Sequence, residues 1–128
     1  MRILVDTHLL LWASDYPDRL SNAASTLLND PGNELLFSPL SIWEVAVKGA
    51  LGRPDFRFDP QTLRNNLLAN GYAELVFTSE HAIAIPGLPL LHKDPIDRLL
   101  IAQATVEGIL LVTVDRQIAQ YPGPIRKV

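Results

Sequence analysis

Four acidic residues stand where they could share one chemical task. Asp6 and Asp115 each directly follow an apolar run, and Glu44 and Asp97 lie near the starts of expected helices. An ionised carboxylate at the end of a buried strand needs a partner, and several carboxylates together repel one another unless a cation lies between them. Oxygen ligands of this kind suit Mg²⁺ or Mn²⁺, and such a metal beside a phosphate is equipped for phosphodiester hydrolysis.

Each acid also has a purely structural interpretation. Asp6 could cap a helix over 7–14, and Asp115 could cap residues 115–120. The segment Ser41-Ile-Trp-Glu44 matches a capping box. Asp94 is expected to cap the helix that Pro95 opens, and Asp97, at its third position, would gain from the helix dipole. The convergence of all four acids favours the metal site over four separate caps.

The elements that must position these acids alternate along the chain. Short apolar runs predict strands at 2–6, 34–38, 74–77 and 109–114, with an edge strand at 124–128. Capping and turn residues predict helices at 7–14, Ser21 to about Asp30, Pro39 to about Leu51, Asp59-Pro60 to Asn70-Gly71, a short stretch after Thr78, and Asp94-Pro95 to Gly108. This alternation, without two-residue hairpin signals, predicts one α/β domain over 1–128. Its sheet would be mainly parallel, with ligands bound beyond the carboxyl ends of the strands.

Composition limits the class of protein. The chain has 128 residues and no cysteine, which excludes disulfide scaffolds and thiol nucleophiles. No apolar run reaches membrane-spanning length and no signal peptide is evident, so a soluble, cytoplasmic protein is expected. The net charge of −3 is unpromising for a nucleic-acid binder. It does not exclude one, because four acids on a metal would leave the rest of the surface slightly positive.

The acid-bearing segments resemble the PIN-domain family. They follow one another in the family's order and span roughly residues 2–116, which makes the set specific although each motif alone is weak. A further stretch, His92 to Arg98, looks like a bacterial and archaeal subgroup of VapC-like toxins. The matching segments are Ile3-Leu-Val-Asp-Thr7, Ser41-Ile-Trp-Glu-Val45, Asp97-Arg-Leu-Leu-Ile-Ala-Gln-Ala104 with Gly108, and Leu111-Val-Thr-Val-Asp115.

The resemblance implies a fold, an activity and a partner. The fold would have three layers, α/β/α, and the activity would be that of a Mg²⁺- or Mn²⁺-dependent endoribonuclease using a metal-activated water. The partner would be an antitoxin that blocks the site. By this resemblance, the metal-binding and catalytic residues would be Asp6, Glu44, Asp97 and Asp115. Of these positions, the one at Asp115 varies most within the family. Thr113 matches a residue that often orients a site carboxylate, and Thr7 is expected to do the same.

Several cations flank the acids and could contact RNA phosphates. Lys48, Arg98 and Arg116 are the first candidates, although each taken alone is more often a solvated surface charge. Arg53, Arg57 and Lys93 are further candidates. The three histidines, His8, His81 and His92, are scattered and are interpreted as surface or helix residues without a catalytic role.

The hydrophobic content of 48% is high for a chain of this size and predicts an exposed apolar patch. Candidates are Leu10, Leu11 and Trp12, and the 42–51 helix around Trp43 and Val47. Such a patch would serve a homodimer and an antitoxin helix. Trp12 and Trp43 are therefore interpreted as core or interface residues rather than base-stacking platforms.

Competing classes remain open at this stage. An RNase H-like nuclease also uses clustered acids, but its fold begins with long antiparallel hairpins. A phospho-accepting receiver domain needs an acid at the end of a central strand, where the 74–77 strand ends in Phe77-Thr78. The main alternative is a non-catalytic α/β binding module of PIN or receiver-like type, and the retention of all four acids argues against it.

Overall fold

A computed structural model describes residues 1–91 and 94–128. Within these residues, five strands form one sheet in the order β3-β2-β1-β4-β5, and every neighbouring pair is parallel. The strands are β1 (Arg2–Val5), β2 (Glu34–Phe37), β3 (Ala73–Glu74), β4 (Leu110–Thr113) and β5 (Ile125–Lys127). The expected α/β class with a parallel sheet is therefore confirmed.

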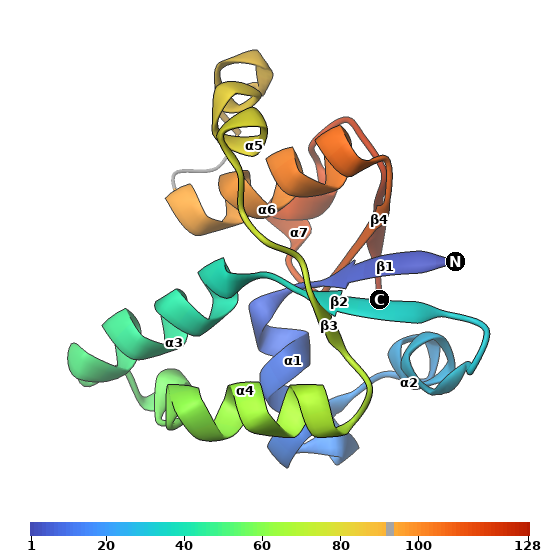
Figure 1. The fold of residues 1–128 in the computed structure, drawn as a ribbon, viewed down its shortest axis with the longest axis vertical. Helices are drawn as coiled ribbons and strands as arrows, with labels where there is room; N and C mark the ends of the chain where they lie inside the picture. Colours follow the sequence, from blue (N-terminus) through green and yellow to red (C-terminus); the bar gives the residue numbers. More distant parts are fainter. Residues whose placement is uncertain (92–93) are drawn as a thin grey trace.

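Helices follow the strands and cover the sheet (Figure 1). The α-helices are α1 (Thr7–Asp15), α2 (Asn22–Asn29), α3 (Pro39–Ala50), α4 (Pro60–Ala69), α5 (Ser79–Ile83), α6 (Pro95–Glu107) and α7 (Arg116–Ala119). Single 3₁₀ turns occupy η1 (Pro17–Arg19), η2 (Pro54–Phe56) and η3 (Ile85–Gly87). None of the helices in the described ranges is long and apolar enough to cross a membrane.

The helix starts confirm the capping predictions. At each predicted start, a side-chain oxygen accepts a hydrogen bond from a backbone N–H in the first turn, which satisfies a group that the helix itself cannot pair. The caps that had been expected and are found are Ser21, Ser38, Asp59, Thr78 and Asp94.

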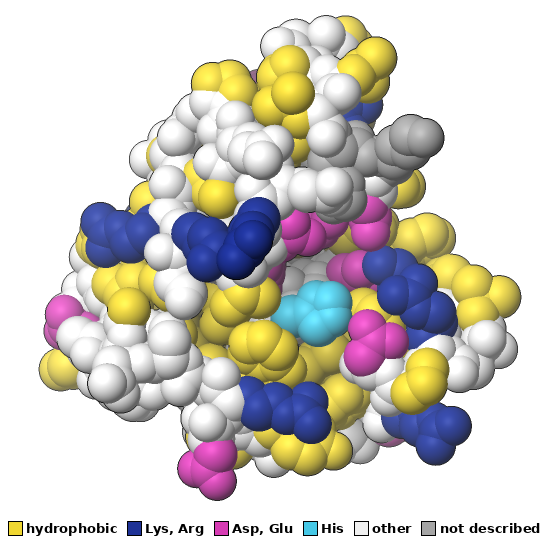
Figure 2. Space-filling model, turned by 180° about the vertical axis from the view of Figure 1, so that it is seen from behind, with side chains coloured by type: hydrophobic (Ala, Val, Ile, Leu, Met, Phe, Trp, Pro, Cys, Tyr) yellow, Lys and Arg dark blue, Asp and Glu magenta, His cyan; other side chains and the backbone are white. Residues whose placement is uncertain are grey.

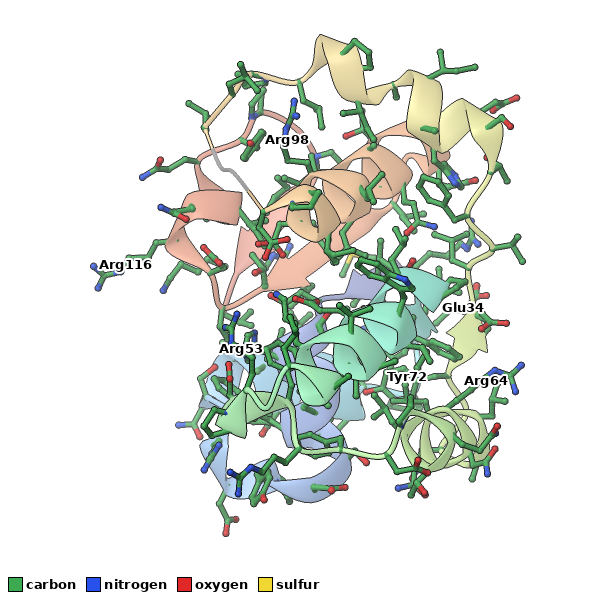
Figure 3. All side chains as sticks on the ribbon, turned by 90° about the vertical axis from the view of Figure 1, so that its left-hand side faces the viewer. Glu34, Arg53, Arg64, Tyr72, Arg98 and Arg116 are labelled. Atoms are coloured by element: carbon green, nitrogen blue, oxygen red, sulfur yellow. The ribbon has the colours of Figure 1, made fainter. Side chains whose placement is uncertain are left out.

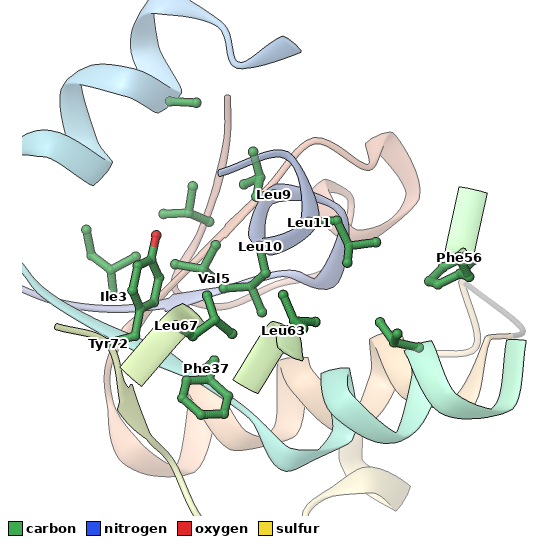
Figure 4. Close-up of a cluster of buried hydrophobic side chains, with 13 residues drawn as sticks. Ile3, Val5, Leu9, Leu10, Leu11, Phe37, Phe56, Leu63, Leu67 and Tyr72 are labelled. Carbon is green, nitrogen blue, oxygen red and sulfur yellow. The ribbon is translucent and has the colours of Figure 1, made fainter. Parts of the chain in front are cut away.

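Two apolar clusters lie on opposite faces of the sheet, which makes three layers. Because side chains alternate along a strand, Ile3 and Val5 face one cluster while Leu4 faces the other. The first cluster packs against α1, α2 and α4 (Figure 4), and the second packs against α6 and α7. The predicted α/β/α layering is confirmed.

Two sequence predictions need correction. The strand expected at 74–77 is shorter, Ala73–Glu74, because the chain leaves the sheet edge after the Leu75 N–H donates to the Phe37 carbonyl at 2.8 Å. Leu10 and Leu11 are buried, 0% and 1% exposed, and belong to the core rather than to a surface patch. The physical reason is that α1 is covered by α4 as well as by the sheet, so its consecutive leucines all face protein.

Candidate active site

The site lies at the carboxyl end of β1, the middle strand of the sheet. β1 pairs with β2 on one side and with β4 on the other, so the edge beyond β1 and β4 is a topological switch point. Asp6 directly follows β1, and Asp115 comes two residues after β4, so both lie at this edge. Helices α3 and α6, which carry Glu44 and Asp97, contact each other. That the four acids share one metal site remains a prediction from the sequence.

Asp6 is held by two separate parts of the chain. Its Oδ1 accepts the Leu9 N–H at 3.0 Å as the N-cap of α1. Its Oδ2 accepts the Thr113 hydroxyl and the Val114 N–H, the latter at 3.3 Å. The side chain is 4% exposed, and this burial raises its pKa, against the opposing effect of the Thr113 hydrogen bond. Asp6 is therefore both a helix cap and a fixed, desolvated carboxylate.

The structure does not support the interpretation of Glu44 as part of a capping box. Helix α3 begins at Pro39 with Ser38 as its cap, so Ser41 lies inside the helix and the capping box expected at 41–44 is absent. Glu44 is 3% exposed. Its Oε2 pairs with Lys48, whereas Oε1 is buried and has no hydrogen-bond partner among the described residues. A buried carboxylate oxygen without a donor is costly, so this atom suits a ligand.

Lys48 lies inside the acidic cluster. Its ammonium pairs with Glu44 and, at 3.2 Å, with Asp94 Oδ2, and it lies 4.9 Å from the centre of the Phe56 ring. Burial lowers the pKa of Lys48, but the two carboxylates outweigh it and raise the pKa above its usual value. In this arrangement Lys48 is an internal counter-ion to acids, which differs from the expected phosphate contact.

The pKa of Asp97 is strongly raised. It lies in the first turn of α6, which Asp94 caps. Burial and then the neighbouring negative charges raise its pKa to about 8, so in the metal-free protein it is mainly protonated at neutral pH. A neighbouring negative charge raises the pKa of a carboxyl because it opposes ionisation. The residues whose charge acts on Asp97 are Asp94, Glu44, Asp115 and Asp6.

Asp115 is the N-cap of α7. Its Oδ1 accepts the N–H groups of Gln117 at 2.7 Å and Ile118 at 3.4 Å, so its structural interpretation as a cap holds. The Asp115 N–H donates to the Thr113 hydroxyl oxygen at 3.0 Å, while that hydroxyl donates to Asp6. Thr113 thereby connects the two strand-end acids.

Thr7 has a different contact from the one expected. Its hydroxyl donates to Ser41 Oγ at 2.9 Å rather than to one of the four acids. Both side chains are buried, so the bond joins the start of α1 to α3. Thr7 acts on the site through the helix that carries Glu44.

The two arginines proposed as phosphate contacts differ. The Arg98 Nη2 donates to the carbonyls of Ile85 at 3.4 Å and Leu88 at 3.2 Å, so this guanidinium supports the η3 segment. Arg116 is exposed and extends away from the body of the protein (Figure 3). Lys93, the further candidate for a phosphate contact, and His92, the first residue of the VapC-like stretch, lie outside the described residues.

His81 is a helix residue, one of the two interpretations given to the histidines, and it is fully buried in α5. Its Nδ1 accepts the Thr78 N–H at 2.9 Å, which assigns the proton to Nε2, 2.9 Å from Glu107 Oε1. The spacing Thr78-x-x-His81 was the available signal, since His replaces the usual acid of a capping box. This histidine fastens α5 to α6 and is structural.

The donor chemistry fits a hard divalent cation. Across residues 1–91 and 94–128, no group of three or more acidic or imidazole side chains is placed to hold a metal ion. Mg²⁺ is usually bound by one or two carboxylates together with waters and substrate phosphates, so a complete protein cage is not required. The unpartnered Glu44 oxygen and the high pKa of Asp97 mark where a cation would relieve an electrostatic cost.

Comparison with known proteins assigns the class. The family model described as PIN domain matches residues 3–124, and the chain belongs to this family. A curated relative, Ribonuclease VapC22 of Mycobacterium tuberculosis, is 31% identical over 126 residues, covering 95% of this chain and 93% of the relative.

Solved structures show the same fold. A chain of VapBC2 from Rickettsia felis, solved bound to a fragment of its promoter DNA, aligns with a TM-score of 0.72 at 17% identity, covering 99% of this chain and 98% of that one. A chain of DNA-bound VapBC from Salmonella typhimurium aligns with a TM-score of 0.69 at 14% identity, with the same coverage.

Proposed function

We propose that this protein is a divalent-metal-dependent endoribonuclease and the toxin component of a VapBC-type toxin–antitoxin pair. The observation that carries the proposal is the acidic cluster: the buried Glu44 Oε1 has no hydrogen-bond partner among the described residues, and burial together with four other carboxylates raises the pKa of Asp97. Membership of the PIN-domain family and 31% identity to a ribonuclease support the activity. The likeness to VapBC complexes supports the partner.

Asp6, Glu44, Asp97 and Asp115 would hold Mg²⁺ or Mn²⁺. Bound there, the ion would lower the pKa of a water molecule that it binds and would neutralise charge on the phosphate. Asp6 is held rigid by Leu9, Thr113 and Val114, so its carboxylate needs little reorganisation. Glu44 presents its free Oε1, and Asp97 gives up its proton when the ion binds.

The cations take separate roles in this proposal. Lys48 balances Glu44 and Asp94 before the ion binds and lies close enough to the acids to meet a substrate phosphate afterwards. Arg116, exposed on α7 beside Asp115, is the second candidate for a phosphate contact. Arg98 is committed to the carbonyls of 85–88 and is withdrawn from this role.

The activity is tested on the purified chain with structured RNA. We expect cleavage with Mg²⁺ or Mn²⁺ and none with EDTA. Asp6→Asn should keep the fold, because Asn caps helices about as well as Asp, and should abolish cleavage because it removes the negative charge. Equal cleavage with and without chelator would exclude the metal-dependent mechanism, and full activity of Asp6→Asn would reduce Asp6 to a cap.

The partner is tested by co-expression with the adjacent open reading frame. An antitoxin segment placing an Arg or Lys near the acids would compete with the metal and inhibit the enzyme. Co-purification with loss of nuclease activity is expected. Co-purification of an active nuclease would leave the enzyme but remove the toxin assignment. A properly folded chain that binds this partner yet cleaves no RNA would instead support the non-catalytic binding module.

A further inference from the structure

A pocket opens along α1, the helix that Asp6 caps. It has a volume of about 330 Å³ and lies between α1 and the segment that carries η2. This volume is at the lower end of the range for small-molecule sites. His8 lines one end, on the first turn of α1, two residues after Asp6. Leu11, Trp12 and Tyr16 line it as well, so the pocket extends along α1 from the turn that Asp6 caps.

The walls of this pocket combine aromatic rings with cations. Trp12, Tyr16 and Phe58 all line it, and the Tyr16 and Phe58 rings meet edge to face at 6.1 Å. Arg19 lies over the Tyr16 ring at 4.5 Å, and Arg57 lines the same pocket. Aromatic rings beside arginines are typical of sites for single-stranded nucleic acid, because bases stack on ring faces and phosphates pair with cations.

One carboxylate in the wall adds a hydrogen-bond acceptor. Asp55 Oδ2 lies 3.4 Å from His8 Nε2, and the side chain is 49% exposed. A carboxylate there can accept hydrogen bonds from the amino or imino groups on the edge of a base. Figure 2 shows a histidine on this exposed face, with acidic side chains beside it and hydrophobic and basic side chains around it.

We propose that this pocket binds a nucleobase of single-stranded RNA, one that neighbours the phosphodiester held at the acidic site. The inference rests on the proposed ribonuclease function and assigns its substrate subsite. The base stacks against Tyr16 and Trp12, so Trp12 takes the stacking role that the sequence interpretation had set aside. Arg57 pairs with a flanking phosphate, and Asp55 faces the edge of the base. The mixture of aromatic rings and cations favours RNA over an apolar peptide helix, for which two arginines would be poor neighbours.

Binding is measured in EDTA, so that no strand is cut. The chain has two tryptophans, and in Trp43→Phe only Trp12 remains to fluoresce. A short single-stranded RNA should quench Trp12, and an abasic strand of the same length should not. Loss of a stacking ring costs about fivefold or more in affinity, so Tyr16→Ala should weaken RNA binding by at least that factor.

Matched variants distinguish the effects of ring stacking and of charge on RNA binding from the general effect of replacing a residue. Tyr16→Phe keeps the ring and should bind as wild type. Arg57→Ala should weaken binding and reduce its salt dependence. Arg64→Ala, which removes an arginine of α4 that pairs with Glu74 on β3, should change neither.

Three results would overturn the proposal. RNA could leave Trp12 unquenched, or Tyr16→Ala could bind RNA as wild type does. Tyr16→Ala could also keep RNA binding but lose a co-expressed antitoxin, which would make the pocket a protein site. If the wild type cleaves RNA with Mn²⁺ under any of these results, only the pocket assignment fails. If it cleaves no RNA, the proposed function fails, while the EDTA measurement still decides the pocket.

Discussion

Lys48 is the residue on which the electrostatics of the metal-free site depend. Its ammonium pairs with a carboxylate four residues away on the same helix and with another, Asp94, 46 residues away. Its side chain is 19% exposed and that of Glu44 4%, so the pair is only weakly screened by water. Removing one member of such a pair leaves an uncompensated charge.

Lys48→Met should therefore have two opposite effects. The metal-free protein should lose about 1–3 kcal/mol of unfolding free energy, between the values for exposed and buried pairs. Its affinity for Mn²⁺ should rise, because a competing positive charge has left the carboxylates. Urea unfolding in EDTA measures the first effect, and calorimetric titration with Mn²⁺ measures the second. Lys127→Met, on an exposed residue of β5, is the control. Unchanged stability would mean that Lys48 does not act as a counter-ion.

Asp97 makes metal binding depend on pH. With a pKa of about 8 in the folded protein, it carries a proton that a metal must displace at lower pH. Mn²⁺ affinity should rise by up to about tenfold for each pH unit below 8, then level off. Stability of the metal-free fold should change in the opposite sense. The raised pKa favours the folded state most below the ordinary value of 3.8, and this advantage is lost as pH rises to about 8.

Titrations at pH 6 and pH 7 measure this dependence. Asp97→Asn provides the comparison, because an amide holds no titrating proton and both trends should flatten. Equal Mn²⁺ affinity at the two pH values in the wild type would contradict the assignment of a protonated Asp97.

At the scale of elements, the connection from α6 to β4 sets the position of Asp115. Gly108 ends α6 with φ +65° and ψ +35°, a left-handed conformation, and the next N–H, that of Ile109, donates back to Ala104 at 3.1 Å. The chain can then enter β4 parallel to β1. A side chain at this position would meet no neighbour, so any cost lies in the backbone alone.

Gly108→Ala should cost about 1–2 kcal/mol of stability, the penalty for a left-handed L-residue. Gly87→Ala is a matched control, since Gly87 also has open space around it and its φ is not positive. Thermal unfolding of the two variants makes the comparison. A loss for Gly87→Ala as large as that for Gly108→Ala would contradict the backbone explanation.

Local chemistry made the helices predictable, and tertiary contacts limited the rest. Capping residues such as Asp59 and Asp94 act within three residues, so sequence is enough to find them. β3 was overestimated because its length depends on how far it pairs with β2. The four acids were found as a pattern, but the Lys48–Asp94 pair joins residues that only the fold brings together.

At the scale of the whole molecule, exposed apolar side chains remain after the core is built. Trp43 is 53% exposed on α3, and Leu51, just beyond its end, is 75% exposed. With Leu10 and Leu11 now in the core, α3 carries the interface prediction. Because contiguous exposed apolar patches mark interaction sites, α3 is the segment on which we test for one.

We expect a homodimer in which α3 takes part. Light scattering at micromolar concentration should give twice the mass of one chain, and Trp43→Glu should shift the protein towards monomer. Val76→Glu, at a side chain 64% exposed on another segment, should not. A monomeric wild type at this concentration would contradict the expectation.

The hydrogen bond from Thr113 to Asp6 joins residues separated by 107 positions. A ribosome makes Asp6 before Thr113, and β4 must reach β1 before the carboxylate is fixed. Until the chain has been extended by those 107 positions, therefore, Asp6 is present without the strand that orients it. For a protein that cuts RNA, this order of assembly delays the activity until β4 has emerged from the ribosome.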